Sequence, residues 1–127
     1  VQRILGAVST VRLLPPQPYV EFIHLMRQST LVITDSGGLQ EELPTLGVPV
    51  LVTRDSTERT EGLQAGTAQQ VGTDKATIEA AVLRTLSAPR SAPLPNPYGD
   101  GQAARRVCEA LLWSAGVGER PAEFTPG

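Results

Sequence analysis

The stretch that decides the fold of this chain is LVITDSGGLQEE, residues 31–42. Its first four residues are apolar or β-branched, which is typical of a strand buried on both faces of a parallel sheet. The run ends at residues 35–38, and Leu39 and Leu43 then recur at helical spacing. Gly47 follows in the position that commonly ends a helix. We therefore predict a strand, a tight turn and a helix in direct succession.

The rest of the sequence alternates strands with helices in the same way. Further strands are expected at residues 11–14, 48–52 and 67–71. Further helices are expected at residues 18–28, 74–86 and 101–115. The connecting segments are a polar loop at residues 53–66 with room for a short helix, a proline-rich linker at 88–97, and a loosely ordered tail after Ala115.

Strands that are separated by helices of this length form a parallel sheet with right-handed crossovers. The chain is therefore expected to be one α/β domain over residues 1–115, with residues 116–127 as a tail. In open sheets of this kind, ligands bind at the carboxyl ends of the strands. Functional residues are expected in the loops that follow Leu14, Thr34, Val52 and Val71.

Composition excludes several classes of partner and site. The formal charge is −2, from 11 basic and 13 acidic residues, so no basic excess marks a surface for nucleic acid or an anionic membrane. No apolar stretch approaches the roughly 18 residues that a spanning helix needs, and no signal segment opens the sequence, so a soluble, cytoplasmic protein is expected. The single cysteine, Cys108, excludes an internal disulfide and cannot by itself form a metal site. We expect Cys108 to be buried on the apolar face of the last helix.

The turn at Ser36, Gly37 and Gly38 is the strongest candidate for a binding site. Adjacent glycines at a helix start let a ligand approach the backbone, and the first amides of the helix point outward at its positive end. A phosphate is the anion that such a turn most plausibly binds, with the Ser36 hydroxyl as a further donor. The alternative interpretation is a plain tight turn without a ligand.

Glu42 extends this hypothesis from an anion to a nucleotide. It lies six residues after Ser36, which is too far along the helix for a cap. A carboxylate beside a diphosphate site is explained if it accepts the hydroxyl groups of a ribose, as acidic residues do in other nucleotide-binding folds. The alternative is that Glu41 and Glu42 are ordinary acidic residues near a helix N-terminus.

Three further residues are candidates with a weaker signal. Arg59 follows the strand at residues 48–52, so its guanidinium is placed to bind phosphate oxygens; the alternative is a surface arginine paired with Glu58 or Glu61. Gln17 and Phe22 flank the helix that begins near Pro18, where an aromatic ring is able to pack on a base; the alternative for Phe22 is a place in the core. His24 has no metal-binding neighbour in the sequence and is interpreted as structural or facing solvent.

Six motifs together resemble a known family. They read TDSGGLQEE at residues 34–42, GVPVL at 47–51, RDSTER at 54–59, AGT at 65–67, VGTD at 71–74 and NPYGDGQA at 96–103. In this order and at this spacing they closely resemble the C-terminal part of the non-hydrolysing UDP-N-acetylglucosamine 2-epimerases. The hydrolysing relatives carry a serine-rich turn in place of the Asp-Ser-Gly-Gly turn, which favours the non-hydrolysing branch.

The resemblance implies a fold, a reaction and a set of contacts. The implied fold is part of the C-terminal, Rossmann-like domain of a GT-B-type two-domain protein that binds its nucleotide sugar between the domains. The implied reaction interconverts UDP-GlcNAc and UDP-ManNAc by elimination and re-addition of UDP, without a cofactor. Carried over by position, the uracil contacts are Gln17 and Phe22, the diphosphate turn is Ser36, Gly37 and Gly38, the ribose acid is Glu42, and the nucleotide-binding arginine is Arg59.

The resemblance also implies what lies outside this chain. The family's catalytic carboxylates belong to the N-terminal domain, so no catalytic residue is assigned here and the isolated chain is expected to be inactive. The only methionine, Met26, lies inside a predicted helix, which indicates a piece of a longer protein. Two central strands of the sheet are expected to be missing between residues 11–14 and 31–34, and the full-length protein is expected to form a homodimer. The sequence departs from the family at Thr60, where proline is usual, and at Ser56, where threonine is common.

Two other functions remain open at this point. One is half of a GT-B glycosyltransferase, which shares the nucleotide cleft. The other is a stand-alone or degenerate module that binds UDP without catalysing a reaction.

Overall fold

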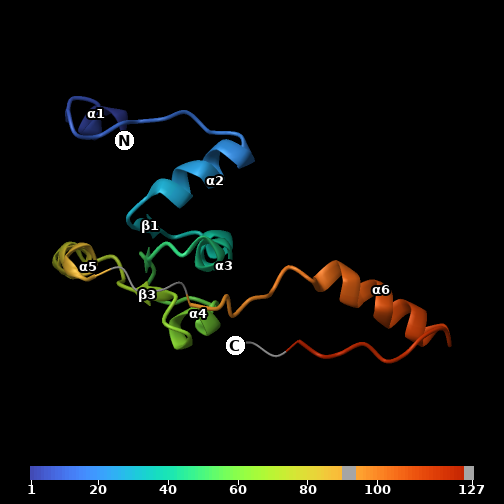
Figure 1. Ribbon diagram of the computed structural model, residues 1–127. Coiled ribbons are helices and arrows are strands. Elements are labelled where there is room, and N and C mark those ends of the chain that lie inside the picture. Colours follow the sequence, from blue (N-terminus) through green and yellow to red (C-terminus); the bar gives the residue numbers. More distant parts are fainter. Residues whose placement is uncertain (90–93, 125–127) are drawn as a thin grey trace.

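The sheet at the centre of the molecule has three parallel strands in the order β1-β2-β3 (Figure 1). The computed structural model describes residues 1–89 and 94–124. The strands are β1 (Val32–Thr34), β2 (Val50–Val52) and β3 (Ala68–Gln70). Val50 of β2 pairs with Val32 on one side and with Ala68 on the other. All three strands therefore point the same way, and their carboxyl ends meet at one edge, as the sequence predicts.

Helices connect and flank these strands. They are α1 (Gln2–Leu5), α2 (Tyr19–Gln28), α3 (Gly37–Leu46), α4 (Thr60–Gln64), α5 (Lys75–Ser87) and α6 (Ala103–Ser114). The expected fold class, a parallel sheet flanked by helices, is confirmed, and α4 is the short helix for which the polar loop had room. The four-residue α1 was not predicted, because it is too short to show an apolar periodicity.

The core has two layers, one on each face of the sheet. Side chains alternate along β2, so Val50 and Val52 face one layer and Leu51 faces the other. The first layer also contains Met26 of α2 and Leu43 of α3. The second layer also contains Val71, which follows β3, and Ala81 of α5. The sheet is thus sandwiched between α2 and α3 on one side and α5 on the other.

Two helix ends have the capping structures that the sequence predicts. Gly47 ends α3 in the left-handed conformation with φ of 66°, and its N–H donates to carbonyl groups of the last turn. Asp74 begins α5, and its side chain accepts a hydrogen bond of 2.8 Å from the N–H of Thr77. These caps fix where the helices stop and start relative to the strands.

The expected strand at residues 11–14 is not formed. Leu14 is 52% exposed, and the segment has no regular structure. A strand is stabilised by pairing with a neighbour, and no described strand lies beside this segment. Figure 1 shows α1 and the chain that follows it standing apart from the sheet, beyond α2. The two central strands that the sequence analysis expects to be missing are the ones that would pair with this segment.

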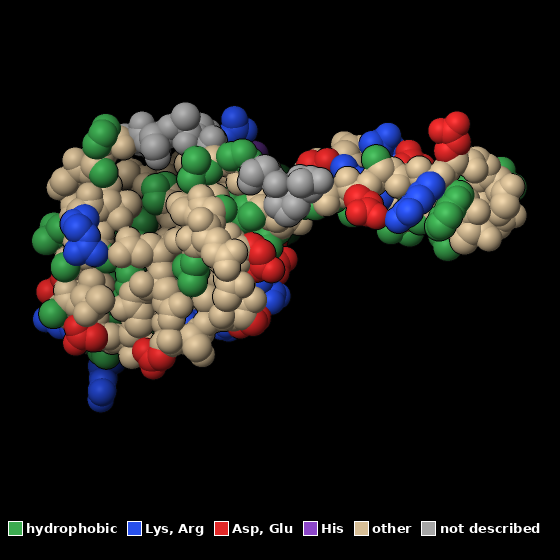
Figure 2. All heavy atoms as spheres, turned by 90° about the horizontal axis from the view of Figure 1, so that it is seen from below, with side chains coloured by type: hydrophobic (Ala, Val, Ile, Leu, Met, Phe, Trp, Pro, Cys, Tyr) green, Lys and Arg blue, Asp and Glu red, His purple; other side chains and the backbone are tan. Residues whose placement is uncertain are grey.

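The expectation that Cys108 is buried is also wrong. Cys108 is exposed on α6, and its apolar neighbours Val107 and Leu111 are 57% and 64% exposed. Figures 1 and 2 show why, because α6 and the chain after it extend as an arm from the rounded body. The amphipathic pattern of α6 predicted the helix correctly, but the apolar face of the helix stays largely exposed in the described part of the chain.

The predicted linker and tail are described only in part. Residues 90–93 of the predicted linker lie outside the described residues, as do residues 125–127 of the tail. The tail has no helix or strand over residues 115–124. Within the described ranges, none of the helices is both long enough and apolar enough to cross a membrane.

Candidate functional site

The turn between β1 and α3 is built by local hydrogen bonds around Ser36. The Ser36 N–H donates to Oγ1 of Thr34 at 3.0 Å, which bends the chain as it leaves the strand. The Ser36 hydroxyl oxygen in turn accepts from the N–H of Leu39 at 3.5 Å, so Ser36 is the N-cap of α3. The turn therefore starts a helix at the carboxyl edge of the sheet, where the sequence placed the anion site.

Gly37 and Gly38 keep the approach to this helix start open. A Cβ atom added at Gly38 would meet only the Ser36 Oγ, at 4.0 Å. A Cβ atom added at Gly37 would lie 3.3 Å from Glu58 Oε1 and 3.8 Å from Arg59 Nη2. Neither glycine has a positive φ, so their value here is the space that they leave rather than an unusual backbone conformation.

Arg59 is the cation that the fold brings to this turn. It comes from the loop after β2, and its Nε donates to Oε1 of Glu41 on α3. Its Nη1 lies 3.5 Å from Oε1 of Glu58. The hydrogen bond that Arg59 donates to Glu41, together with the negative charge of Glu41, raises the pKa of Arg59 above its ordinary value, so the guanidinium stays charged. The alternative that Arg59 pairs with Glu58 is thus confirmed, and Glu41 is a second carboxylate partner of the guanidinium.

Glu58 places a carboxylate over the helix start. Its Oε2 accepts from Nη1 of Arg54 at 2.9 Å, while Oε1 faces Gly37 and Arg59. A hydrogen bond from its own backbone N–H, and the charges of Arg54 and Arg59, lower the pKa of Glu58. Glu58 is therefore ionised at neutral pH, and an anion that binds at the turn has to share Arg59 with it.

A buried amide, which the sequence reading missed, ties these two loops together. Gln40 is fully buried; its Nε2 donates to the Ser36 carbonyl at 3.3 Å, and its Oε1 accepts from the Thr57 hydroxyl at 3.1 Å. The Thr57 hydroxyl oxygen also accepts from the Arg59 N–H at 3.1 Å. The position of Gln40 three residues before Leu43, on the same helix face, is the sequence signal that points to its burial. Its hydrogen bonds link the α3 turn to the Arg59 loop.

Glu42 lies at the junction of α3 with α2. Its Oε2 accepts a hydrogen bond of 3.2 Å from the Tyr19 hydroxyl. The negative charge of Glu42 raises the pKa of Tyr19, which keeps the phenol protonated as a donor. The sequence reading did not select Tyr19, although it lies on the predicted helix close to Gln17 and Phe22. The pair forms a polar corner about two turns from Ser36, within reach of a ligand longer than a phosphate.

Gln17 lies just before α2 and Phe22 lies within it, and no hydrogen bond among the described residues connects either side chain to the turn at Ser36. The Gln17 Nε2 donates to the carbonyl of Pro15 at 2.8 Å, close by in sequence. Phe22 is 36% exposed and belongs to neither core cluster, so the alternative that it is a core residue is wrong. His24 is exposed, in agreement with its interpretation as facing solvent. The structure thus groups Ser36, the two glycines and Arg59 closely, with Glu42 beside Tyr19 and the α2 residues farther out.

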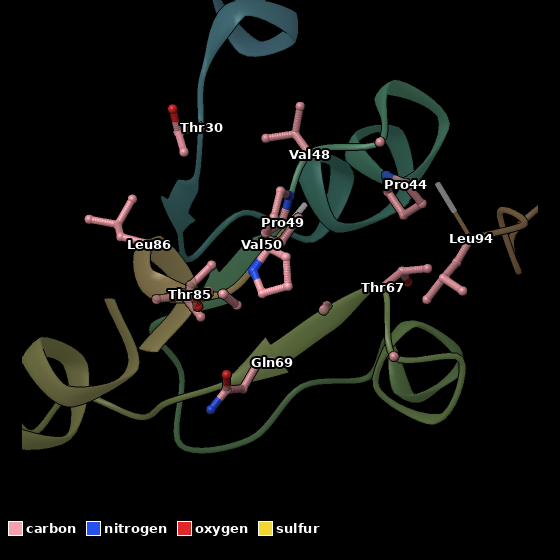
Figure 3. A pocket seen from close by; sticks show the side chains of 16 residues that line it. Thr30, Pro44, Val48, Pro49, Val50, Thr67, Gln69, Thr85, Leu86 and Leu94 are labelled. Carbon is pink, nitrogen blue, oxygen red and sulfur yellow. The ribbon is translucent and has the colours of Figure 1, made fainter. Parts of the chain in front are cut away.

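A cavity of about 470 Å³ lies at the opposite edge of the sheet (Figure 3). It is lined at the amino ends of β2 and β3 by residues that include Pro49, Val50 and Thr67. Pro89 and Leu94, which border the residues outside the described ranges, also line it. Because ligands of parallel sheets bind at the carboxyl edge, the turn at Ser36 remains the candidate site.

Comparisons with known proteins identify the family. The family model for UDP-N-acetylglucosamine 2-epimerase matches residues 1–112. The chain is 52% identical over 115 residues to the UDP-N-acetylglucosamine 2-epimerase of Escherichia coli K12, with 87% of this chain and 31% of the relative covered. It is 43% identical over 125 residues to the Bacillus subtilis enzyme of the same name, with 94% of this chain and 33% of the relative covered.

Solved structures give the same result. The S. aureus MnaA–UDP co-structure superposes with a TM-score of 0.88 at 36% identity, over 98% of this chain and 35% of that one. The Neisseria meningitidis UDP-GlcNAc 2-epimerase bound to UDP-GlcNAc gives a TM-score of 0.78 at 42% identity, over 88% of this chain and 32% of that one. This chain spans about a third of the length of the relatives that it matches. From its sequence match over residues 1–112 and its fold, the chain belongs to the UDP-N-acetylglucosamine 2-epimerase family.

Proposed function

We propose that this chain supplies the UDP-binding part of a non-hydrolysing UDP-N-acetylglucosamine 2-epimerase, corresponding to its C-terminal domain. The whole protein then interconverts UDP-GlcNAc and UDP-ManNAc and acts as a homodimer. Relatives with high similarity have been solved with UDP and with UDP-GlcNAc, which supports this choice of ligand. The catalytic groups come from the part of the family protein that this chain does not span.

The observation that carries the proposal is the convergence of three features at one turn. Two glycines leave open space at the N-terminus of α3, Ser36 caps this helix and offers a hydroxyl group, and Arg59 reaches over from the loop after β2. Helix amides and a guanidinium are the groups that bind phosphate oxygens in proteins. We assign the diphosphate to this turn.

The remaining assignments follow from the direction in which a nucleotide extends from the turn. Glu42 accepts the ribose hydroxyl groups, and Tyr19 holds its carboxylate in place through their hydrogen bond. The base then lies toward α2, where Gln17 supplies polar groups and Phe22 an exposed ring for stacking. The segment that carries Gln17 has no strand to hold it in the isolated chain, so this end of the site is its least organised part.

The chemistry proposed for the whole protein explains why an anion site is required. In the elimination step, a base from the part of the family protein that this chain does not span removes the proton on C2 of the sugar. The electrons of that C–H bond form a C1–C2 double bond, the bond between C1 and the diphosphate oxygen breaks, and UDP leaves with the bonding electrons. The charge that develops on the diphosphate is stabilised by preorganised donors, here the α3 amides, the Ser36 hydroxyl and Arg59. In the re-addition step, the same groups hold UDP while its diphosphate oxygen bonds to C1 again and C2 takes up a proton from the opposite face, which inverts the configuration at C2.

Calorimetric titration of the chain with UDP, beside Glu42→Ala, tests the proposal. Loss of hydrogen bonds to a charged acceptor is expected to weaken UDP binding by about 10- to 100-fold. Glu79→Ala is the matched control, because it removes an exposed carboxylate from α5, away from the site, and is expected to leave the affinity unchanged. A folded parent that does not bind UDP, or equal affinities of parent and Glu42→Ala, would overturn the proposal.

A second candidate function is a module that binds UDP without turnover. It needs only the turn at Ser36, Arg59 and Glu42, and no catalytic group. The two functions differ when the rest of a family protein is added. Restored conversion of UDP-GlcNAc to UDP-ManNAc, followed by NMR of the anomeric protons, supports the epimerase; UDP binding without restored conversion supports the module.

A further inference from the structure

Tyr98 makes a long-range contact with the loop that carries Arg59. Its hydroxyl oxygen accepts a hydrogen bond from the Gly62 N–H at 2.8 Å and its proton is donated to the Arg59 carbonyl at 3.1 Å. The two partners lie 36 and 39 residues away along the chain. One phenol group therefore holds both ends of the first turn of α4.

This contact replaces a cap that α4 lacks. Arg59 is the N-cap residue of α4, and its side chain forms no capping hydrogen bond, because a guanidinium has no acceptor. A side chain at the N-cap commonly accepts from the N–H of the second or third helical residue, and Gly62 is the third residue of α4. The Tyr98 hydroxyl accepts from that N–H, so the Arg59 side chain is left to point at the α3 turn.

Gly62 is required for this approach. It is buried, and a Cβ atom added there would lie 2.7 Å from the Tyr98 hydroxyl oxygen and 3.4 Å from its ring. A side chain at position 62 would therefore push the phenol off the helix. Burial also raises the pKa of Tyr98, which keeps its hydroxyl proton available for the Arg59 carbonyl.

The segment that carries Tyr98 is itself anchored to α3. The Asn96 Nδ2 donates to the Glu41 carbonyl at 2.9 Å and to Oγ1 of Thr45 at 2.7 Å. The Asn96 Oδ1 accepts from the Tyr98 N–H at 3.0 Å. Asn96 thus fixes Tyr98 to the same helix that carries Glu41, the ion-pair partner of Arg59. The backbone of Arg59 is therefore tied to α3 through Tyr98 and Asn96, and its side chain through Glu41.

We propose that Tyr98 is a positioning residue, which caps α4 in place of Arg59 and so directs the Arg59 guanidinium to the diphosphate turn of α3. The inference rests on the proposed UDP site. It assigns to Tyr98 a role in phosphate binding that acts through Arg59. Loss of the hydroxyl group weakens the binding of ligands that carry the diphosphate and spares ligands without it.

The test compares UDP with uridine in Tyr98→Phe and Gly62→Ala, each checked for folding by circular dichroism. Both variants are expected to weaken UDP binding about three- to tenfold, the equivalent of one hydrogen bond, and to leave uridine binding unchanged by NMR titration. Thr85→Val is the control, because it removes a part-buried hydroxyl hydrogen bond within α5. It is expected to leave both ligands unaffected.

An Arg59→Gln background separates positioning from a general loss of structure. In that background Tyr98→Phe is expected to cause no further loss of UDP affinity, because the group that it positions is gone. Equal UDP affinities of the parent, Tyr98→Phe and Gly62→Ala would overturn the inference but leave the UDP site intact. The same conclusion would follow if the variants lost uridine binding as much as UDP binding. It would also follow if Tyr98→Phe weakened UDP binding as much in the Arg59→Gln background as in the parent. A parent that does not bind UDP would overturn the proposed function and this inference with it.

Discussion

At the scale of single residues, the site is charge-balanced before any ligand arrives. Arg59 pairs with Glu41 and Glu58, and Glu58 also pairs with Arg54. This network therefore pairs two guanidinium groups with two carboxylates at the point where we place the diphosphate. Binding an anion here exchanges one negative partner of Arg59 for another.

This exchange predicts that Glu58→Gln strengthens UDP binding. Glu58 Oε1 faces the start of α3, and neutralising it removes a like charge from the proposed diphosphate position. Because charges near the surface interact weakly, an increase in affinity of only about two- to fivefold is expected by calorimetry. Glu61→Gln, which removes a carboxylate of α4 that does not pair with Arg59 in the described part of the chain, is the control. Weaker binding by Glu58→Gln would show that Glu58 contacts the ligand favourably.

The sequence predicted these residues unequally. Ser36, the glycines and Arg59 could be selected because they lie next to strands whose ends are visible in the apolar pattern. Gln40 and Tyr98 were missed, because their roles depend on hydrogen bonds to residues 17 to 39 positions away. No local pattern reports such contacts. Motifs that matched the family, such as NPYGDGQA, were visible without showing what they do.

At the scale of helices and strands, capping residues determine where α3 ends and where α5 begins. Gly47 ends α3 at φ of 66°, which costs a residue with a Cβ atom roughly 1–2 kcal/mol. Gly47→Ala is therefore expected to lower the free energy of unfolding in urea by about that amount. Gly38→Ala is the matched control: Gly38 lies inside α3 with open space around it, so stability is expected to be unchanged or slightly higher. Equal losses in the two variants would contradict the cap assignment.

The cap of α5 predicts a pH dependence. Hydrogen bonds from the Thr77 N–H and hydroxyl lower the pKa of Asp74 below its ordinary value of 3.8. A carboxylate whose pKa is lowered by folding stabilises the protein above its unfolded pKa and loses this effect as the pH falls through the folded value. Unfolding in urea is thus expected to show a deficit for Asp74→Ala that is constant between pH 5 and 8 and shrinks below about pH 4. A deficit that is the same at pH 3 would contradict this explanation.

An apolar run predicted a strand correctly only where a neighbouring strand is present to pair with it. The apolar runs at residues 48–52 and 67–71 contain β2 and β3, since both have partners in the chain. Residues 11–14 carry a similar pattern but remain unpaired, because strand formation depends on a neighbour and not on the pattern alone. The same reason applies to Cys108, whose burial required a surface for α6 to cover.

At the scale of the whole molecule, one compact body carries the stability. Leu43 is completely buried between the sheet and α2, in the larger of the two core clusters. Leu43→Ala is expected to lower the free energy of unfolding by about 2–5 kcal/mol, a large part of the 5–15 kcal/mol typical of a domain. Leu83→Ala, at a position 67% exposed on α5, is the control and is expected to cost less than about 1 kcal/mol. Similar losses at both positions in urea unfolding would place the core elsewhere.

NMR titration of the labelled chain with UDP shows whether the nucleotide binds at the start of α3. UDP is expected to shift the amide signals of Gly37 and Gly38 and the Nε signal of Arg59, with saturation at a common affinity. Shifts confined to Val48, Val50 and Ala68 would instead place the nucleotide in the cavity at the opposite edge of the sheet and exclude the turn at Ser36 as its site. A folded chain whose spectrum does not change with UDP would contradict binding at this turn as well.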